Sequence, residues 1–357
     1  MSRHVVFDIS GHGYGHFAQT APVINALQKL KPDWKITLRT RLPANLVSHR
    51  IVGQYELLNH ASDFGMAMNS ALDVDRDKSL QHYVHAHASL TKTMQNEAKK
   101  LSQLKPDLLF SNISYVSIAA AKITGIPAIA MCSLNWADIF AGYCHGEEAN
   151  RIYAQIVECY QQADRFLCPE PSMAMPEFNT KPIAALSALG TSIKPELIRQ
   201  HPLAANRKIV LIVPGGIPTA MDTRHWPVSE DFFYITTWRA EKHRDDIIDI
   251  ADSGFAFVDV LASCDVVVTK VGYGMFAESM CNRVPMLYVR RHDWPEEPPL
   301  VDWAESFGKV HEITREQFFA GQYAADISAL EKKTWRRPAP KAGGEREACR
   351  AIVELVS

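Results

Sequence analysis

Short apolar runs alternate along the first half of the chain with longer segments in which apolar residues recur at helical spacing. The runs, which are typical of buried strands, are Val5–Ile9, Ile36–Arg39, Leu108–Ser111 and Ala128–Met131. Between them, Phe17–Leu30 and Val116–Ile123 have the periodicity of helices, and Lys78–Leu104 is predicted to be a long polar helix with a break. Strands that alternate with helices predict a parallel sheet with crossover helices.

The same pattern starts again near residue 208. Predicted strands and helices follow in the order Lys208–Val213, Phe232–Thr236, Phe257–Ala262, Asp265–Thr269, Met275–Cys281 and Pro285–Val289. A segment with four prolines, Pro169–Pro182, is predicted to connect the two parts. We therefore expect two Rossmann-like α/β domains, residues 1–182 and 183–340, that face each other across a cleft where a ligand binds. Residues 341–357 are predicted to contain an amphipathic helix that packs across the domain boundary.

Glycine-rich turns follow three of the predicted strands. Gly272 and Gly274 are expected to allow a tight turn, which would place backbone N–H groups at the carboxyl edge of the sheet, where they stabilise a phosphate. Pro214-Gly215-Gly216 occupies the equivalent place after another strand, and Ser10–His16 follows the first. The alternative is that these glycines only form turns; for residues 214–216 the two interpretations are equally good.

Composition excludes several kinds of partner. The 38 Lys and Arg residues are balanced by 40 Asp and Glu residues, so no general basic field exists to bind nucleic acid or an anionic membrane. Seven cysteines without C-x-x-C spacing indicate reduced thiols and no zinc site. No apolar stretch has transmembrane length and no leader is recognised. We expect a cytoplasmic protein of unknown oligomeric state.

Four stretches carry a resemblance to a known family. They are GHGYGH (residues 11–16), SNISYVSIAAAKITGIPAIAM (111–131), LNWADIFAGY (134–143) and KVGYGMFAESMCNRVPMLYVRRHDWPEEPPL (270–300). They resemble GT-B glycosyltransferases, of the branch with the peptidoglycan N-acetylglucosaminyltransferase and the plant UDP-glycosyltransferases. The likeness is closest to the glycosyltransferase-like N-terminal region of plant arabinokinases and its stand-alone bacterial relatives. It implies a GT-B fold and sugar transfer from a nucleotide diphosphate donor, UDP by family habit, to an unknown acceptor.

On the acceptor side, the resemblance makes His16 the general base or a contact to the donor, with His12 as a second candidate. A base with a pKa near neutrality suits deprotonation of a hydroxyl, although His16 could equally cap a helix. Asn112 stands where relatives often have an aspartate that orients the histidine, and turn formation is its simpler role. Asn135, Trp136 and Asp138 follow another strand end, where Asp138 is an alternative acid or base or a helix N-terminal charge.

On the donor side, the resemblance assigns one group of residues to the nucleotide sugar. Diphosphate contacts are expected from Gly215, Gly216, Gly272, Tyr273 and Gly274, ribose contacts from Glu278, base contacts from the backbone of Phe257 and Val258, and sugar contacts from Glu296 and Glu297. Arg290 and Arg291 are interpreted as a counter-charge to the leaving diphosphate or, as is more usual, as a solvated pair at a strand end, and the same two alternatives stay open for Lys270. No D-x-D metal motif is evident in either candidate loop, and no further ligands can be placed beside His82, His85 and His87. We therefore expect no metal, and no cofactor besides the nucleotide sugar as co-substrate.

Two other functions remain open at this point. A GT-B epimerase of nucleotide sugars needs the same diphosphate site with an added acid/base pair around the sugar. A sugar-nucleotide-binding protein without catalysis is favoured by Asn112 in place of the expected acid.

Overall fold

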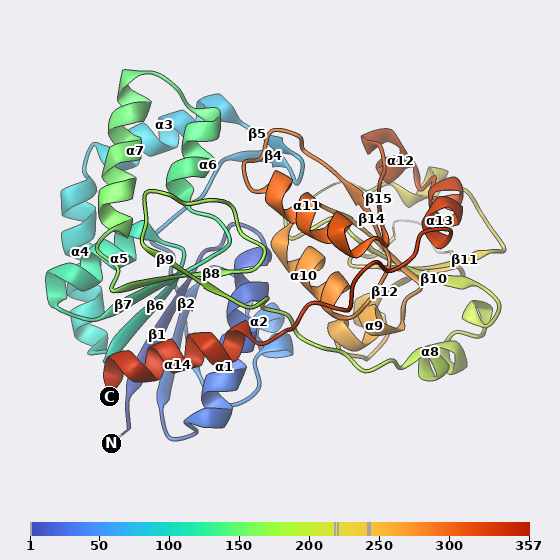
Figure 1. Cartoon of the computed structure of the whole chain (residues 1–357), viewed down its shortest axis with the longest axis horizontal. Helices are drawn as coiled ribbons and strands as arrows, with labels where there is room; N and C mark the ends of the chain where they lie inside the picture. The colour runs from blue at the N-terminus through green and yellow to red at the C-terminus, as the bar shows by residue number, and fades with distance from the viewer. Residues whose placement is uncertain (1, 218, 220, 241–243) are drawn as a thin grey trace.

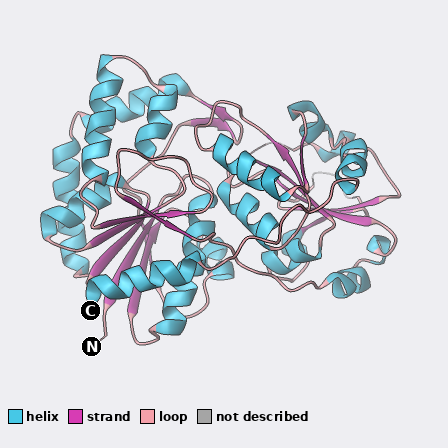
Figure 2. Ribbon diagram, in the orientation of Figure 1, coloured by secondary structure: helices cyan, strands magenta, loops and turns pink. Residues whose placement is uncertain are grey.

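The computed structural model describes residues 2–217, 219, 221–240 and 244–357. Two parallel sheets lie side by side, and helices cover both faces of each (Figures 1 and 2). We call residues 2–183 the first half and residues 194–341 the second half. The α/β architecture with two Rossmann-like sheets is therefore confirmed.

The first sheet has the strand order β3-β2-β1-β6-β7-β8-β9, and all of its pairs are parallel. Its strands are β1 (His4–Ile9), β2 (Lys35–Thr40), β3 (Glu56–Asn59), β6 (Leu108–Asn112), β7 (Ala128–Met131), β8 (Arg165–Pro169) and β9 (Thr180–Ile183). Its helices are α1 (Gly15–Leu30), α2 (Ala44–Arg50), α3 (Arg76–His87), α4 (Leu90–Leu104), α5 (Tyr115–Thr124), α6 (Trp136–Tyr143) and α7 (Glu147–Tyr160). A small antiparallel pair, β4 (Met68–Ser70) and β5 (Asp73–Val74), reaches toward the second half.

The second sheet has the order β12-β11-β10-β13-β14-β15, again parallel throughout. Its strands are β10 (Lys208–Val213), β11 (Phe232–Thr236), β12 (Ile247–Asp249), β13 (Val266–Lys270), β14 (Met286–Val289) and β15 (Val310–Glu312). Its α-helices are α8 (Lys194–Gln200), α9 (Phe257–Ser263), α10 (Tyr273–Cys281), α11 (Glu297–Phe307), α12 (Arg315–Ala320) and α13 (Ala324–Glu331). Three 3-10 turns, η1 (Pro202–Ala204), η2 (Thr223–His225) and η3 (Ile250–Asp252), connect them.

The central strands are buried on both faces, which explains their apolar sequences. In β10 five consecutive residues, Ile209–Val213, are buried, since helices cover both sides of a parallel sheet. β1 is buried over its whole length, and Phe7 packs on Phe110 of the neighbouring strand with ring centroids 5.1 Å apart. β-branched and aromatic side chains fit such pleated, enclosed surfaces.

Each sheet reverses its strand order at one place. β1 lies between β2 and β6, and β10 lies between β11 and β13. At such a reversal the two flanking connections leave toward opposite faces of the sheet and open a crevice at the carboxyl ends of the strands. The expected site residues His16 and Asn112 follow β1 and end β6, while Gly215 and Gly272 follow β10 and β13.

A two-residue connection, Val271-Gly272, turns the chain from β13 into α10 as the sequence predicted, although neither Gly272 nor Gly274 adopts a conformation that requires glycine. Gly272 has φ −178°, an extended conformation open to any residue, and Gly274 lies inside α10. What they provide is the absence of a side chain. A Cβ at Gly274 would lie 3.0 Å from the Cβ of Ala18, so this glycine lets α10 pack closely on α1.

The last helix, α14 (Gly344–Val356), packs on α1, β6 and β9 of the first half. Figure 1 shows it in red beside α1, near the chain's two ends. Residues 184–193 connect the two halves, and we call them the connecting segment. The last helix touches this segment at Gly344, where a Cβ would lie 2.1 Å from the carbonyl oxygen of Ala184. Its apolar face is covered by α1 rather than by both halves, so we propose to count it with the first structural unit instead of as a bridge.

This packing predicts the effect of a cavity in α14. Ile352 is fully buried in the core shared with α1, so Ile352→Ala should lower the free energy of unfolding by about 2–5 kcal/mol. Denaturant unfolding measures it, with the exposed Arg350→Ala on the same helix as the control, expected within about 0.5 kcal/mol of wild type. Equal stabilities of the two variants would contradict the packing described.

Candidate active site

The glycine-rich segments of the two halves meet. A Cβ at Gly216 would lie 2.5 Å from the backbone nitrogen of Tyr14, and a Cβ at Gly13 would lie 3.9 Å from Ile217. Together with the contact of α1 and α10 at Gly274, these approaches bring the strand-order reversals of the two sheets against each other. A ligand bound there would contact both halves.

His16 lies in the first turn of α1 and is held by the end of β6. Its Nδ1 is 2.9 Å from Oδ1 of Asn112. Burial lowers the pKa of His16 to about 4, although the hydrogen bond to Asn112 acts in the opposite direction. The ring lies beside Trp136, with centroids 5.5 Å apart. The imidazole is therefore neutral at pH 7 and able to accept a proton.

His12 lies between two tryptophans at the same place. Its ring is parallel to that of Trp294, with centroids 6.0 Å apart, and perpendicular to that of Trp136 at 5.1 Å. Burial lowers the pKa of His12 to about 3, with the neighbouring His16 as the next cause. The Nε2 atom is buried and has no hydrogen-bond partner among the described residues. An unpaired buried nitrogen here leaves a polar group available to a ligand hydroxyl.

Lys270, for which the sequence left open a solvated charge or a counter-charge to the diphosphate, lies between the two glycine segments of the second half. A Cβ at Gly215 would be 2.7 Å from Cε of Lys270, and a Cβ at Gly272 would be 3.3 Å from its Nζ. Within the described part of the chain, the ammonium donates one hydrogen bond, to the carbonyl of Val271 at 3.3 Å. Desolvation, followed by the charge of Arg291, lowers the pKa of Lys270 to about 7. A poorly satisfied cation in this place fits an anionic ligand.

The N-termini of α1 and α10 add positive potential. Their N-cap residues, Tyr14 and Gly272, have no side-chain capping hydrogen bond, and neither helix has an acidic residue in its first turn. The first turns of both helices lie together at Ala18 and Gly274. Uncapped N–H groups and the helix dipoles favour a bound anion.

Glu296 joins the two halves. It is buried as the N-cap of α11, and it accepts a hydrogen bond of 2.6 Å from Ser133 of the first half and one of 3.2 Å from Nε1 of Trp294. Burial raises the pKa of Glu296. Glu297 is placed differently: its carboxylate accepts bonds from the backbone of Arg291 and His292 and from Nε of Arg291. These bonds occupy Glu297 in holding its own loop. Glu296 is likewise buried with both oxygens bonded to protein groups, so the structure favours neither carboxylate for sugar contacts.

Three other expected site residues have structural partners. Asn135 is the N-cap of α6, and Asp138 accepts bonds from Asn135 (2.7 Å) and Tyr153 (3.2 Å), so the carboxylate closes the helix start rather than facing His16. The hydroxyl of Tyr273 accepts from the backbone N–H of Leu186 and donates to the carbonyl of Glu170. It points toward the segment that connects the halves, away from a diphosphate at Gly272.

The expected nucleoside contacts are covered by other groups. Nη1 of Arg50 donates to Glu278 at 2.7 Å, and its guanidinium lies over the ring of Phe257 at 4.8 Å. A Cβ at Gly190 would lie 2.0 Å from the carbonyl oxygen of Val258, so the connecting segment lies on that carbonyl. A nucleoside between Phe257 and Glu278 would have to displace or stack on Arg50.

Sequence reasoning missed several residues of this region. Asp63, in an irregular segment without periodicity, accepts from Nε1 of Trp136 at 2.9 Å, and burial raises the pKa of Asp63 to about 6. Gln19 and Ser133 bond to each other at 2.8 Å. These two had a signal: Gln19 lies three residues after His16 on one helix face, and Ser133 follows the carboxyl end of β7. Arg291 is buried over Trp294, not solvated.

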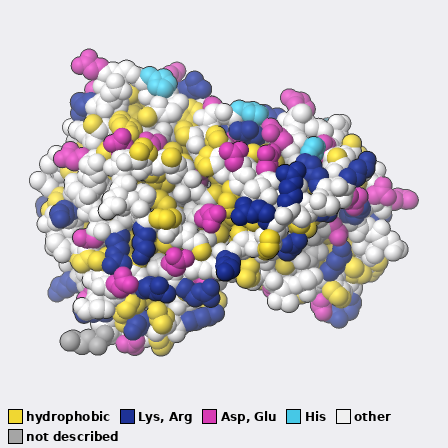
Figure 3. Space-filling view, viewed as in Figure 1, with side chains coloured by type: hydrophobic (Ala, Val, Ile, Leu, Met, Phe, Trp, Pro, Cys, Tyr) yellow, Lys and Arg dark blue, Asp and Glu magenta, His cyan; other side chains and the backbone are white. Residues whose placement is uncertain are grey.

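Among the described residues, no group of three or more His, Cys, Asp or Glu side chains is placed to hold a metal ion, and this includes the histidines of α3. His87 is buried and bonds to Gln155 and Tyr115 instead of lying on a solvated face. No helix within the described ranges is long and apolar enough to cross a membrane. Figure 3 shows basic and acidic side chains spread over both halves.

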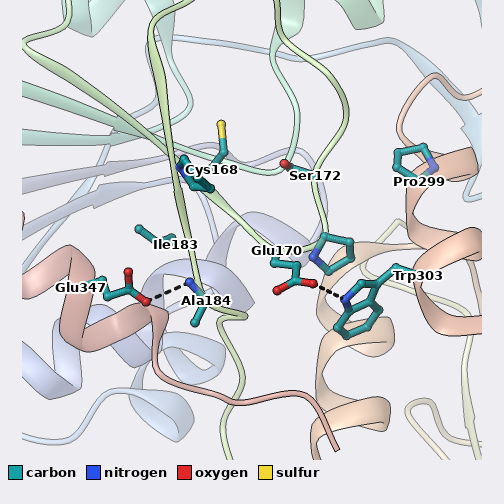
Figure 4. A pocket seen from close by; sticks show the side chains of 10 residues that line it. Cys168, Glu170, Ser172, Ile183, Ala184, Pro299, Trp303 and Glu347 are labelled. Carbon is teal, nitrogen blue, oxygen red and sulfur yellow. Dashed lines mark hydrogen bonds between the residues drawn. The ribbon is translucent and has the colours of Figure 1, made fainter. Parts of the chain in front are cut away.

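Two open pockets lie outside the glycine segments. One of about 450 Å³ lies where the connecting segment meets α11 and α14 (Figure 4). Its polar groups are already paired: Glu170 accepts from Nε1 of Trp303, and Glu347 accepts from the backbone N–H of Ala184. The other, of about 470 Å³, lies beside Arg290 and α12. Neither contains His16, Lys270 or Glu296 in its lining.

Comparison with known proteins gives a family match. The model of a family described as glycosyl transferase family 1 matches residues 3–293. The L-arabinokinase of Arabidopsis thaliana is 26% identical over 335 residues, which cover 90% of this chain and 32% of that protein. The chain thus spans about a third of the length of this curated relative.

Solved structures share the fold at low identity. The calicheamicin glycosyltransferase CalG4 has a TM-score of 0.59 and 14% identity, covering 100% of this chain and 98% of its own. UGT89C1 of Arabidopsis thaliana, solved in complex with UDP, has a TM-score of 0.57 and 12% identity, with 100% of both chains covered. These similarities establish the GT-B fold.

The hydrogen bond between His16 and Asn112 predicts how the pKa of His16 would change if an aspartate replaced Asn112. Asn112→Asp places a carboxylate beside Nδ1, which stabilises the imidazolium, so the pKa of His16 should rise by about 1–3 units from its low value. An NMR titration of the His16 ring measures this shift. Asn150→Asp, exposed on α7, is the control and should leave the pKa of His16 unchanged. An unaltered titration in Asn112→Asp would mean that the two side chains are not in contact.

Proposed function

This chain belongs to glycosyl transferase family 1 and is a glycosyltransferase, and we propose that it moves a sugar from a nucleoside diphosphate sugar to an acceptor hydroxyl with His16 as general base. UDP is proposed as the nucleoside diphosphate; the UDP complex of the similar UGT89C1 supports this choice. The proposed reaction needs no metal ion, because protein groups supply the positive charge.

One observation carries the proposal: the partly buried side chain of Lys270 lies beside the uncapped N-terminus of α10, and among the described residues its ammonium has one weak acceptor, the carbonyl of Val271. When the bond from the anomeric carbon to the diphosphate breaks, negative charge develops on the leaving oxygen. Lys270 and the N–H groups of α10 are positioned to stabilise that charge in an enclosed site. Gly215 and Gly272 keep side chains out of the space around the ammonium.

His16 supplies the proton acceptor. In the proposed step the acceptor O–H gives its proton to Nε2, the oxygen bonds to the anomeric carbon, and the electron pair of the broken C–O bond leaves with the diphosphate. With its pKa at about 4, His16 is unprotonated from pH 5 upward and ready to act. Trp136 and Trp294 both lie against the ring of His12 and add buried apolar surface beside the two histidines.

Asp63 favours a second candidate function. Its carboxyl, with a pKa raised to about 6, adjoins Trp136, which also contacts His12 and His16. This is the additional acid/base group that a nucleotide-sugar epimerase requires. NMR of a nucleotide sugar incubated without acceptor separates the two functions: a new sugar epimer that disappears in Asp63→Asn supports epimerisation, and an unchanged sugar supports transfer.

Donor binding should depend on Lys270 and on pH. Its pKa is depressed in the free protein and a bound diphosphate raises it, so affinity is greatest below pH 7 and falls as the pH rises through 7. Lys270→Gln should weaken binding by about 10–150-fold at pH 6.5, the equivalent of about 1.5–3 kcal/mol for a bond to a charged group, and should flatten the pH dependence. Calorimetry with UDP-glucose, whose diphosphate diester does not titrate in this range, is the measurement.

The exposed Lys332→Gln is the matched control for charge loss and should bind as wild type does. Wild-type-like affinity in Lys270→Gln would overturn the assignment of the diphosphate site.

Catalysis should depend on His16 without affecting the donor. His16→Ala should lower kcat by about 10²–10⁴-fold and leave the dissociation constant of the donor within about twofold. UDP release from UDP-sugars with a panel of alcohol and phenol acceptors gives kcat. The exposed His145→Ala is the control, and EDTA should change neither variant. Full activity in His16→Ala would exclude it as the base.

A further inference from the structure

A continuous chain of buried hydrogen bonds connects His16 to Glu296. Its members come from four places in the sequence: α1, the end of β6, the segment after β7 and the N-cap of α11. In the order in which the hydrogen bonds connect them, they are His16, Asn112, Gln19, Ser133 and Glu296. The successive distances are 2.9, 3.2, 2.8 and 2.6 Å, and each of the five side chains is at most 5% exposed.

The direction of this chain is fixed at the Glu296 end. With Glu296 ionised, its carboxylate only accepts hydrogen bonds: Oε1 accepts from Ser133, and Oε2 accepts from Nε1 of Trp294, which only donates. Ser133 therefore gives its one proton to Glu296. Its oxygen must then accept from the NH₂ group of Gln19.

The same reasoning continues to the imidazole. With its NH₂ group directed at Ser133, Gln19 presents its carbonyl to the NH₂ group of Asn112. Asn112 is thereby turned so that its own carbonyl faces Nδ1 of His16. A carbonyl oxygen only accepts, so Nδ1 carries the single proton of the neutral ring. The other nitrogen, Nε2, keeps its lone pair.

We propose that Glu296, acting through Ser133 and Gln19, sets the tautomer of His16 and so makes Nε2 the proton acceptor. Gln19 and Ser133 are positioning residues, since they touch neither the proposed donor nor the acceptor. Glu296 lies in the second half, so the base in the first half has its correct tautomer only when the halves are together. The catalytic meaning of this chain rests on the proposed role of His16; the tautomer itself does not.

This chain of hydrogen bonds also explains why residue 112 is an asparagine and not an aspartate. An aspartate there would accept at both oxygens and would leave Gln19 no donor to face. Asn112 accepts a hydrogen bond from His16 and donates one to Gln19, so its donor bond to Gln19 fixes which of its atoms faces His16. A carboxylate has no donor and cannot link the two residues in this way. The amide is then a connecting group and not a mark of lost catalysis.

The test is the tautomer of His16, read from its ring ¹⁵N chemical shifts in protein labelled at histidine. Comparison with His16→Gln identifies its signals among those of the 14 histidines. The wild type at pH 7 should carry the proton on Nδ1. Ser133→Ala and Gln19→Leu, which interrupt the chain, should each give a mixture of the two tautomers.

Matched variants keep the test specific. Ser117→Ala removes an equally buried, hydrogen-bonded serine outside the chain and should leave the tautomer unchanged. Gln19→Glu still accepts from Asn112 and should keep the proton on Nδ1, so Leu and Glu at one position are expected to differ. Where transfer is measurable, kcat should fall at least tenfold in Gln19→Leu with donor KM unchanged, since a wrongly protonated base is inactive.

Two results would overturn the proposal: a proton on Nε2 in the wild type, or an unchanged tautomer in both Ser133→Ala and Gln19→Leu. The wild-type measurement decides even if a variant does not fold. Because the shifts are recorded without donor or acceptor, a failure of the transferase proposal in activity assays is distinguishable from a failure of this one.

Discussion

The structure depends on one close approach: the first turns of α1 and α10 lie against each other at Ala18 and Gly274. Two helix N-termini of like polarity repel unless something negative or a close steric fit holds them together. Here the fit is permitted by a glycine, and the potential is increased by Lys270, whose pKa the enclosure lowers to about 7. An anion at this place would reduce both the repulsion between the two helix N-termini and the cost of the desolvated Lys270 ammonium. A diphosphate therefore suits this place.

The two halves are held by polar as well as apolar contacts. Ser133 bonds to Glu296, Arg50 to Glu278, and Arg315 to Asp73 of the β4–β5 hairpin. The first of these is buried and belongs to the chain that ends at His16, whereas the last two include exposed or half-exposed cations. A buried bond loses more when it is broken, since both partners lose water and gain nothing in return. The candidate base is thus tied to a contact between two buried groups, while breaking the Arg50–Glu278 pair would leave the buried Glu278 carboxylate without a partner.

Arg50 illustrates how an expected ligand site can be filled by the protein itself. Its guanidinium contacts the carboxylate of Glu278, which the family resemblance assigns to the ribose, and lies over the ring of Phe257, whose backbone the resemblance assigns to the base. A planar cation between a carboxylate and an aromatic face makes the same kinds of contact as a nucleoside. The ligand-free arrangement therefore satisfies Glu278, which would otherwise be a buried charge without a partner.

The sequence by itself determined the two Rossmann-like sheets, because apolar runs of strand length alternating with helical periodicity have few other solutions. It also placed His16, Asn112, Gly215 and Glu296 at strand ends, where parallel sheets collect their functional groups. Only the tertiary structure decided which of them act together. Whether Lys270 is solvated, whether Glu297 faces a ligand and whether Gln19 meets Ser133 depend on how two halves distant in sequence pack, and local periodicity carries no information about that packing.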